Sequence, residues 1–116
     1  MKKCEQTIDD LRNTFLDNIG IAYDLIKDDY MKMTPEELWE NCFAMTFTRS
    51  FYIFLSYKAL TATKEELSYL QKKSVFNDLT DVYYDGDYSN NHENYETVVK
   101  EYIKTQKKME QTGDMQ

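Results

Sequence analysis

The sequence has few of the residue types on which common catalytic and cofactor sites depend. Its 116 residues include one histidine, His92, and three widely separated glycines, Gly20, Gly86 and Gly113. Scattered glycines exclude the glycine-rich loops that bind phosphates or dinucleotides. A Ser-His-Asp triad or a Cys/His metal site would have to use His92, which we interpret instead as a solvated residue at a helix start. We therefore expect a protein that is not an enzyme and that has no cofactor and no metal.

Cysteines and long apolar runs are also scarce. The two cysteines, Cys4 and Cys42, are far apart in the sequence, and the N-terminus has no apolar segment typical of a secretory signal. We expect free thiols in a reducing compartment, the cytoplasm of a bacterial cell. The longest stretch of low polarity, Phe43–Leu55, contains Arg49 and is shorter than the roughly 20 apolar residues of a membrane-spanning helix. It is typical of a protein core.

Lysine and arginine are absent from the whole segment from Ser74 to Val99, in a chain whose formal net charge is −7. The segment combines carboxylates with tyrosines, a composition that suits contact with a basic protein surface. The negative field of the chain repels phosphate, so we expect no direct nucleic-acid ligand and no membrane surface as a partner.

Six residues remain as the candidate partner-binding surface once the apolar positions of this segment are assigned to a core: Asp81, Tyr84, Asp85, Asp87, Tyr88 and Glu93. Their carboxylates would stand in for nucleic-acid phosphates, and their tyrosines would supply rigid contact area. The alternative is a solvated acidic loop beside core tyrosines. A calcium-binding loop is not expected, because the acid spacing departs from the alternate oxygen ligands of such loops.

Two helix starts are defined by capping signals. Thr34 is a predicted N-cap, with Pro35 at the first helical position and Glu37 completing a capping box. Thr63 and Glu66 repeat the same box before another helix. Two independent starts of this kind favour a mostly helical fold.

Hydrophobic residues recur at steps of three and four along three further segments, which predicts helices packed on a core. The first has Gly20 in its middle, which weakens a helix by about 1 kcal/mol relative to Ala, so the expectation is one helix with a bend or break there. The last begins after a cap at Asn90 or Asn91. The stripes are Ile8, Leu11, Phe15, Ile19, Ala22 and Ile26; Val75, Phe76, Leu79, Val82 and Tyr83; and Tyr95, Val98, Val99, Tyr102 and Ile103.

The segment Phe43–Leu55 is ambiguous because its bulky residues nearly alternate with small polar ones, as in a strand. We favour one long buried helix from Pro35 to Lys58, since the only pairing candidate is a hairpin running from Val82 to Tyr88. The predicted fold is all-α, with four to five helices in a single domain over residues 1–105 and a polar, frayed tail over residues 106–116. The alternative is an α+β fold with a small hairpin.

Arg49 lies close in sequence to Phe51 and Tyr52. A charge in this setting needs a partner, so we expect a salt bridge to an acid of the first helix. The alternative is an interface made of Arg49, Phe51 and Tyr52, because arginine and aromatic residues are enriched at protein contacts. Cys42, in the same aromatic segment, is interpreted as a small core residue.

Capping and core positions over residues 34 to 103 resemble a small family of uncharacterised domains from Firmicutes and their phages and mobile elements. The resemblance implies an all-helical domain in a mobile-element setting, and no functional residues. The chain departs from the family at Phe51 and Tyr52, where the family tends to carry charge. The matching residues are Thr34-Pro35-Glu36-Glu37-Leu38, Cys42-Phe43, Arg49 to Ile53, Glu66-Leu67 with Leu70, and Leu79-Thr80-Asp81-Val82-Tyr83.

These observations together predict a non-enzymatic, acidic protein-binding module. The specific hypothesis is an anti-defence inhibitor, of the anti-CRISPR kind, that occupies a basic nucleic-acid-binding surface of a host protein. One alternative is a homodimeric structural or regulatory module that uses the aromatic helix from Trp39 to Tyr57. Another is a protein that sequesters a small molecule or nucleotide in an aromatic pocket.

Overall fold

The computed structural model describes residues 6–86 and 92–113, with the backbone alone described at residues 92, 93 and 111–113. No strand occurs in these ranges, so the all-α prediction is confirmed and the alternative strand at Phe43–Leu55 is wrong. Helix α5 takes in the first part of the predicted hairpin, and the remainder lies outside the described residues. The helices are α1 (Ile8–Met31), α2 (Pro35–Glu40), α3 (Cys42–Thr61), α4 (Lys64–Ser68), α5 (Val75–Asp85) and α6 (His92–Gly113).

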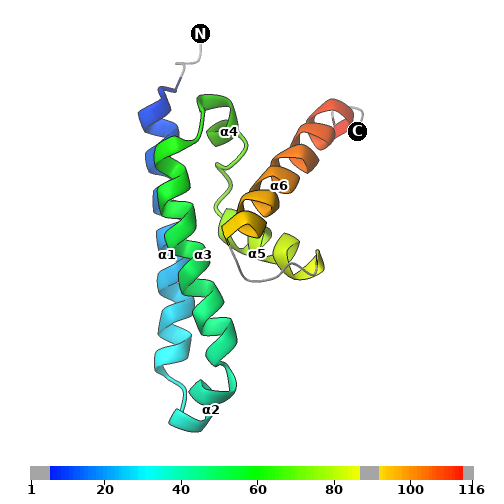
Figure 1. Cartoon of the computed structure of the whole chain (residues 1–116). Helices are drawn as coiled ribbons and strands as arrows, with labels where there is room; N and C mark the ends of the chain where they lie inside the picture. The colour runs from blue at the N-terminus through cyan, green and yellow to red at the C-terminus, as the bar shows by residue number, and fades with distance from the viewer. Residues whose placement is uncertain (1–5, 87–91, 114–116) are drawn as a thin grey trace.

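Helices α1 and α3 form an antiparallel pair along the length of the molecule (Figure 1). The predicted stripe of α1 is buried at Leu11, Phe15 and Ile19, and α1 continues through Gly20 without a break. A methyl group at Gly20 would lie 3.9 Å from the Tyr52 hydroxyl of α3, an ordinary contact distance. The predicted break is therefore absent from this position.

The predicted helix from Pro35 to Lys58 is in fact two helices that meet at Asn41. The side-chain amide of Asn41 donates a 2.8 Å hydrogen bond to the carbonyl of Glu37, which also accepts the backbone N–H of Asn41 at 3.0 Å. The predicted caps at Thr34 and Thr63 are both present as reciprocal capping boxes, and a third, unpredicted one joins Thr7 to Asp10. A side chain that caps one helix end thus allows the chain to turn before α3.

Helices α4, α5 and α6 cover one side of the upper part of the α1–α3 pair (Figure 1). Lys58 of α3 forms ion pairs with two of these helices. Its ammonium lies 2.8 Å from the carboxylate of Glu96 in α6 and 3.8 Å from that of Glu66 in α4. The hydroxyl of Tyr102 is buried, and burial followed by the nearby Asp78 carboxylate raises the pKa of Tyr102 to about 12. Helix α6 extends beyond Gln106, where we expected the chain to fray, as far as Gly113.

The molecule is elongated, with principal extents of 55 × 29 × 27 Å. Its elongation comes from the end of α1, the short α2 and the start of α3, which project beyond α6 (Figure 1). We call this part, residues 23–49, the distal arm. Because few elements cover the distal arm, several of its large apolar side chains are exposed, among them Met31, Trp39 and Phe43.

Candidate functional site

The predicted partner-binding residues that the structure describes lie on the last two turns of α5. Asp81, Tyr84 and Asp85 are exposed, and the Tyr84 side chain is 56% accessible. Glu93 belongs to the first turn of α6, where only the backbone is described. Asp87 and Tyr88 lie outside the described residues.

A groove of about 420 Å³ separates the end of α5 from the junction of α2 and α3. We call it the acidic-aromatic groove. Among the residues that the structure describes, Glu40 is the one charged residue that lines it, and no described lysine or arginine does so. The lining residues are Glu40, Asn41, Phe43, Ala44, Phe47, Tyr83 and Tyr84.

Aromatic contacts fix the shape of this groove. The ring of buried Phe47 stacks on Tyr83 with centroids 4.2 Å apart and lies 5.4 Å from the ring of Tyr84. Phe47 also meets Tyr95 of α6 edge-on at 5.9 Å, which ties the groove to the main core. Phe43, by contrast, is 87% exposed. The groove therefore has a rigid floor and one open aromatic edge.

The tyrosines of the groove are neutral at physiological pH. Burial, with smaller contributions from Tyr30 and Tyr83, raises the pKa of Tyr84 above its ordinary value, and burial does the same to the pKa of Tyr83. Their hydroxyls can donate or accept hydrogen bonds, but they add no charge. The negative charge at this end of the molecule comes from carboxylates such as Glu40, Asp81 and Asp85.

The predicted interface of Arg49, Phe51 and Tyr52 is not a single surface. Phe51 is 0% exposed, so its assignment to an interface is wrong: it faces the core, 5.2 Å from the ring of Tyr95. Tyr52 is half-buried and stacks on Tyr23 of α1, with centroids 4.3 Å apart and ring planes 8° from parallel. Arg49 is exposed and makes no ion pair with a described residue, so the expected salt bridge to α1 is also wrong.

Three residues of α2 and the start of α3 are exposed against the prediction. The sequence predicts Trp39 and Phe43 inside a buried helix and Cys42 in the core, yet all three are exposed. The available signal was the length of the apolar segment, because a helix that is apolar on several faces needs cover on all of them. A single domain of this length has too few other helices to bury every face of this segment.

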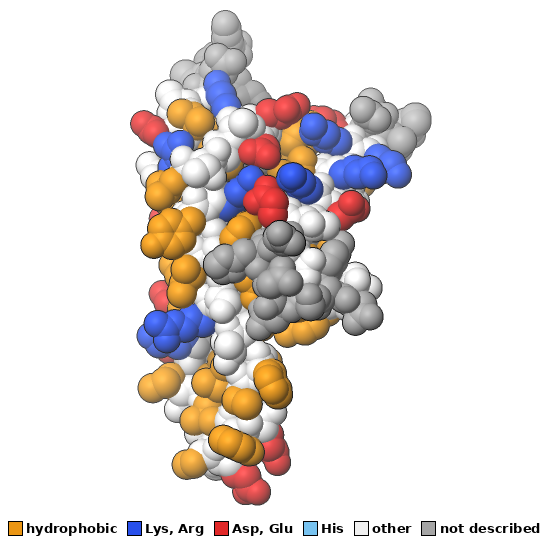
Figure 2. Space-filling model, viewed as in Figure 1, with side chains coloured by type: hydrophobic (Ala, Val, Ile, Leu, Met, Phe, Trp, Pro, Cys, Tyr) orange, Lys and Arg blue, Asp and Glu red, His pale blue; other side chains and the backbone are white. Residues whose placement is uncertain are grey.

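Charge is unevenly distributed along the molecule. The distal arm carries six acidic residues against three basic ones. On the face shown in Figure 2, hydrophobic side chains gather over the distal arm with acidic side chains at its tip, while most lysines and arginines lie near the opposite end. The distal arm thus presents an acidic and apolar surface.

The chain matches no protein-family model, and no curated protein or solved structure is significantly similar to it. Among the helices of the described ranges, none combines the length and the apolar character needed to cross a membrane. The side chains described contain no group of three or more His, Cys, Asp or Glu arranged to hold a metal ion.

Proposed function

We propose that this protein is a non-enzymatic binding module whose acidic-aromatic groove holds a basic segment of a partner protein. The observation that carries the proposal is the pairing of the exposed aromatic residues Phe43 and Tyr84 with the Glu40 carboxylate, with no lysine or arginine among the described residues of the groove lining. Arginine and lysine side chains bind such surfaces through both charge and aromatic faces. A rigid floor at Phe47 limits the ordering cost of binding.

The surroundings of the groove favour a cationic partner further. Asp81 precedes Tyr84 by one helical turn on α5, and Asp85 follows Tyr84 directly. All three residues are exposed. The formal net charge of −7 adds a long-range attraction for basic surfaces. A partner residue such as arginine would contact a carboxylate and a tyrosine ring together.

The basic partner surface that we propose is one that binds nucleic acid, which would make the protein an inhibitor by occupation of that surface. The specific form is an anti-defence inhibitor, of the anti-CRISPR kind, encoded by a phage or mobile element and acting in the bacterial cytoplasm. The support is the interleaving of carboxylates with tyrosines, which supplies charge in place of phosphates and flat area in place of bases. DNA should then compete with the protein for its partner.

The proposal can be tested with a short peptide rich in arginine and lysine, titrated into the full chain. Raising the salt from about 0.1 to about 1 M shortens the Debye length from about 10 to about 3 Å, so the affinity should fall steeply. Glu40→Gln and Asp85→Asn should each weaken binding several-fold, and Tyr84→Ala should do so at every salt concentration.

Asp17→Asn provides the matched control, because Asp17 is an exposed acid on α1, whereas Asp85 is the neighbour in sequence of Tyr84 in the groove lining. It removes the same charge and should leave the affinity nearly unchanged. Equal weakening by Asp17→Asn and Asp85→Asn would mean that the peptide responds to net charge alone. Salt-insensitive binding would refute the electrostatic part of the proposal.

A second candidate function is homodimerisation through the outer face of α3. Ile53, Tyr57 and Leu60 follow one another at steps of four and three, and all are exposed. Such a row is an uncharged stripe on an otherwise acidic molecule, and two copies could meet there without charge repulsion. Light scattering should then detect a dimer. Tyr57→Glu should dissociate this dimer, whereas Asn13→Glu, at an exposed position of α1, should leave it intact. A monomer at high concentration would eliminate this candidate.

A further inference from the structure

A second pocket lies on the distal arm between α1, α2 and α3, and it differs in charge from the rest of the arm. Its volume is about 250 Å³. Lys27 of α1 and Arg49 of α3 line it, and its lining includes no aspartate or glutamate from residues 6–86 and 92–113. In a chain with a net charge of −7, a pocket lined by two cations and no acid is the reverse of the general pattern.

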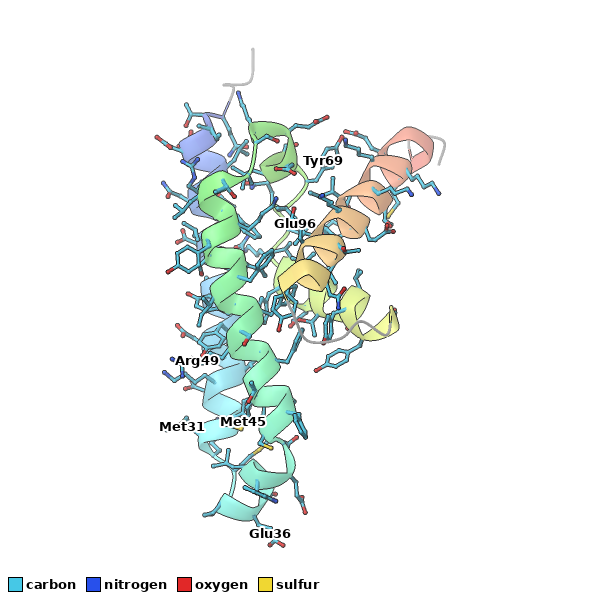
Figure 3. The ribbon with its side chains drawn as sticks, viewed as in Figure 1. Met31, Glu36, Met45, Arg49, Tyr69 and Glu96 are labelled. Carbon is cyan, nitrogen blue, oxygen red and sulfur yellow. The ribbon has the colours of Figure 1, made fainter. Side chains whose placement is uncertain are left out.

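The two cations of this pocket are unpaired among the residues that the structure describes. Neither Lys27 nor Arg49 makes an ion pair or a hydrogen bond there, although Asp24 and Asp28 flank Lys27 in the sequence. Figure 3 shows Arg49 on the same side of the distal arm as Met31. The two donors are therefore available to an anion that enters the pocket.

The interior of the pocket is apolar. Ile26, Leu38 and Met45 come from α1, α2 and α3 respectively, and Met31 adds a flexible, exposed thioether. Methionine side chains adapt their shape to a bound group. A dry apolar cavity of about 150 Å³ is enough to hold benzene, so this pocket has room for a somewhat larger apolar body.

One wall of the pocket is held in place before any ligand arrives. Tyr23 lines the pocket, and its ring is stacked on Tyr52 with centroids 4.3 Å apart. Tyr52 thus acts as a positioning residue for Tyr23. The hydroxyls of Tyr30 and Thr48 also line the pocket and can bind a polar head group.

We infer that this pocket binds a small organic carboxylate with an aliphatic or aromatic body. The carboxylate would bind Lys27 and Arg49, and the body would displace water from Ile26, Leu38 and Met45. This inference does not depend on the proposed function, because the pocket and the acidic-aromatic groove have no lining residue in common.

The test measures the binding of three small-molecule probes to the full chain. Ligand-observed NMR and thermal shift detect the binding, at concentrations below those at which the probes form micelles. Octanoate carries both the charge and the apolar body, octanamide lacks the charge, and acetate lacks the body. Octanoate should bind, octanamide should bind about tenfold more weakly, and acetate should give no measurable binding. Equal binding of octanoate and octanamide would overturn the role of the cations.

Variants locate the site. Lys27→Gln and Arg49→Gln should each weaken octanoate binding about tenfold, whereas Lys32→Gln, an exposed lysine of the same arm that does not line the pocket, should change it less than twofold. All three residues are exposed, so the variants should fold normally. Equal weakening by Lys32→Gln, or no binding of octanoate to the unmodified chain, would refute the inference. Loss of basic-peptide binding alone would count against the proposed function and not against this pocket.

Discussion

Two phenylalanines of α3 have opposite environments. The same substitution should lower the free energy of unfolding strongly at one of them and leave it nearly unchanged at the other. Phe51 is fully buried, whereas Phe43 is 87% exposed at the edge of the acidic-aromatic groove. We consider Phe51→Ala and Phe43→Ala. The two changes remove the same atoms from the same helix, so any difference between them comes from the surroundings alone.

The magnitudes follow from burial. Phe-to-Ala changes in a core cost about 3–5 kcal/mol, because they lose transfer free energy and leave a cavity. Phe51 contacts the rings of Phe47, Phe76 and Tyr95, so the cavity cannot easily close. For a domain whose free energy of unfolding is about 5–15 kcal/mol, this is a large fraction. Phe43→Ala loses little burial and gains about 0.5 kcal/mol of helix propensity, so its net effect should be close to zero.

Urea unfolding followed by circular dichroism measures both changes. With a slope of about 1–3 kcal/mol/M, Phe51→Ala should lower the midpoint by roughly 2 M, or prevent folding altogether, while Phe43→Ala should leave it within about 0.5 M. Titration with the basic peptide should show weaker binding by Phe43→Ala than by the unmodified chain, because Phe43→Ala removes an edge of the groove without unfolding the protein. Similar stability losses in the two variants would refute the assignment of Phe51 to the core and Phe43 to the surface.

Three further predictions concern stability. Gly20→Ala should raise the free energy of unfolding by about 0.5–1 kcal/mol in urea titrations, since the added methyl group has room and the helix gains propensity; a loss would mean that α1 is bent there. The pKa of Tyr102 is raised from 10.0 to about 12 in the folded protein, so its neutral side chain contributes about 2–3 kcal/mol to the free energy of unfolding. This contribution is complete below pH 10 and is lost as the pH rises toward 12. Tyr102→Phe should flatten this alkaline loss, and an unchanged pH profile would contradict it. Lys58→Met should cost about 1–2 kcal/mol, and a double-mutant cycle with Glu96→Gln should show coupling, whereas additive effects would indicate that the pair contributes nothing.

Much of the helical architecture could be predicted from the sequence because its signals are local. The capping boxes at Thr34 and Thr63 depend on residues three apart, and the buried stripe of α1 depends on the period of one helix. The turn at Asn41 was missed because an asparagine inside an apolar segment is no strong breaker. Its effect comes from a side-chain hydrogen bond to Glu37 that competes with helix continuation.

The candidate site was harder to predict because exposure depends on distant elements. Phe43, Phe47 and Phe51 are spaced by four and share one side of α3, so periodicity assigns all of them to the core. Phe47 and Phe51 are covered by rings of α5 and α6, whereas Phe43 lies beyond that cover at the helix start. Helical periodicity identifies the face, but only the tertiary arrangement determines how far along it the cover extends.

The distal arm can carry two sites of opposite charge preference because α3 presents different faces to them. Phe43, Ala44 and Phe47 line the acidic-aromatic groove, whereas Met45 and Arg49 line the second pocket, the one that contains Lys27. At 100° per residue, positions 45 and 49 point about 155° and about 165° away from the mean direction of positions 43, 44 and 47. A substitution at Arg49 should therefore affect carboxylate binding without altering the groove, and a substitution at Phe43 should affect peptide binding without altering the pocket. If either substitution changed both activities equally, the two surfaces would have to be parts of one site.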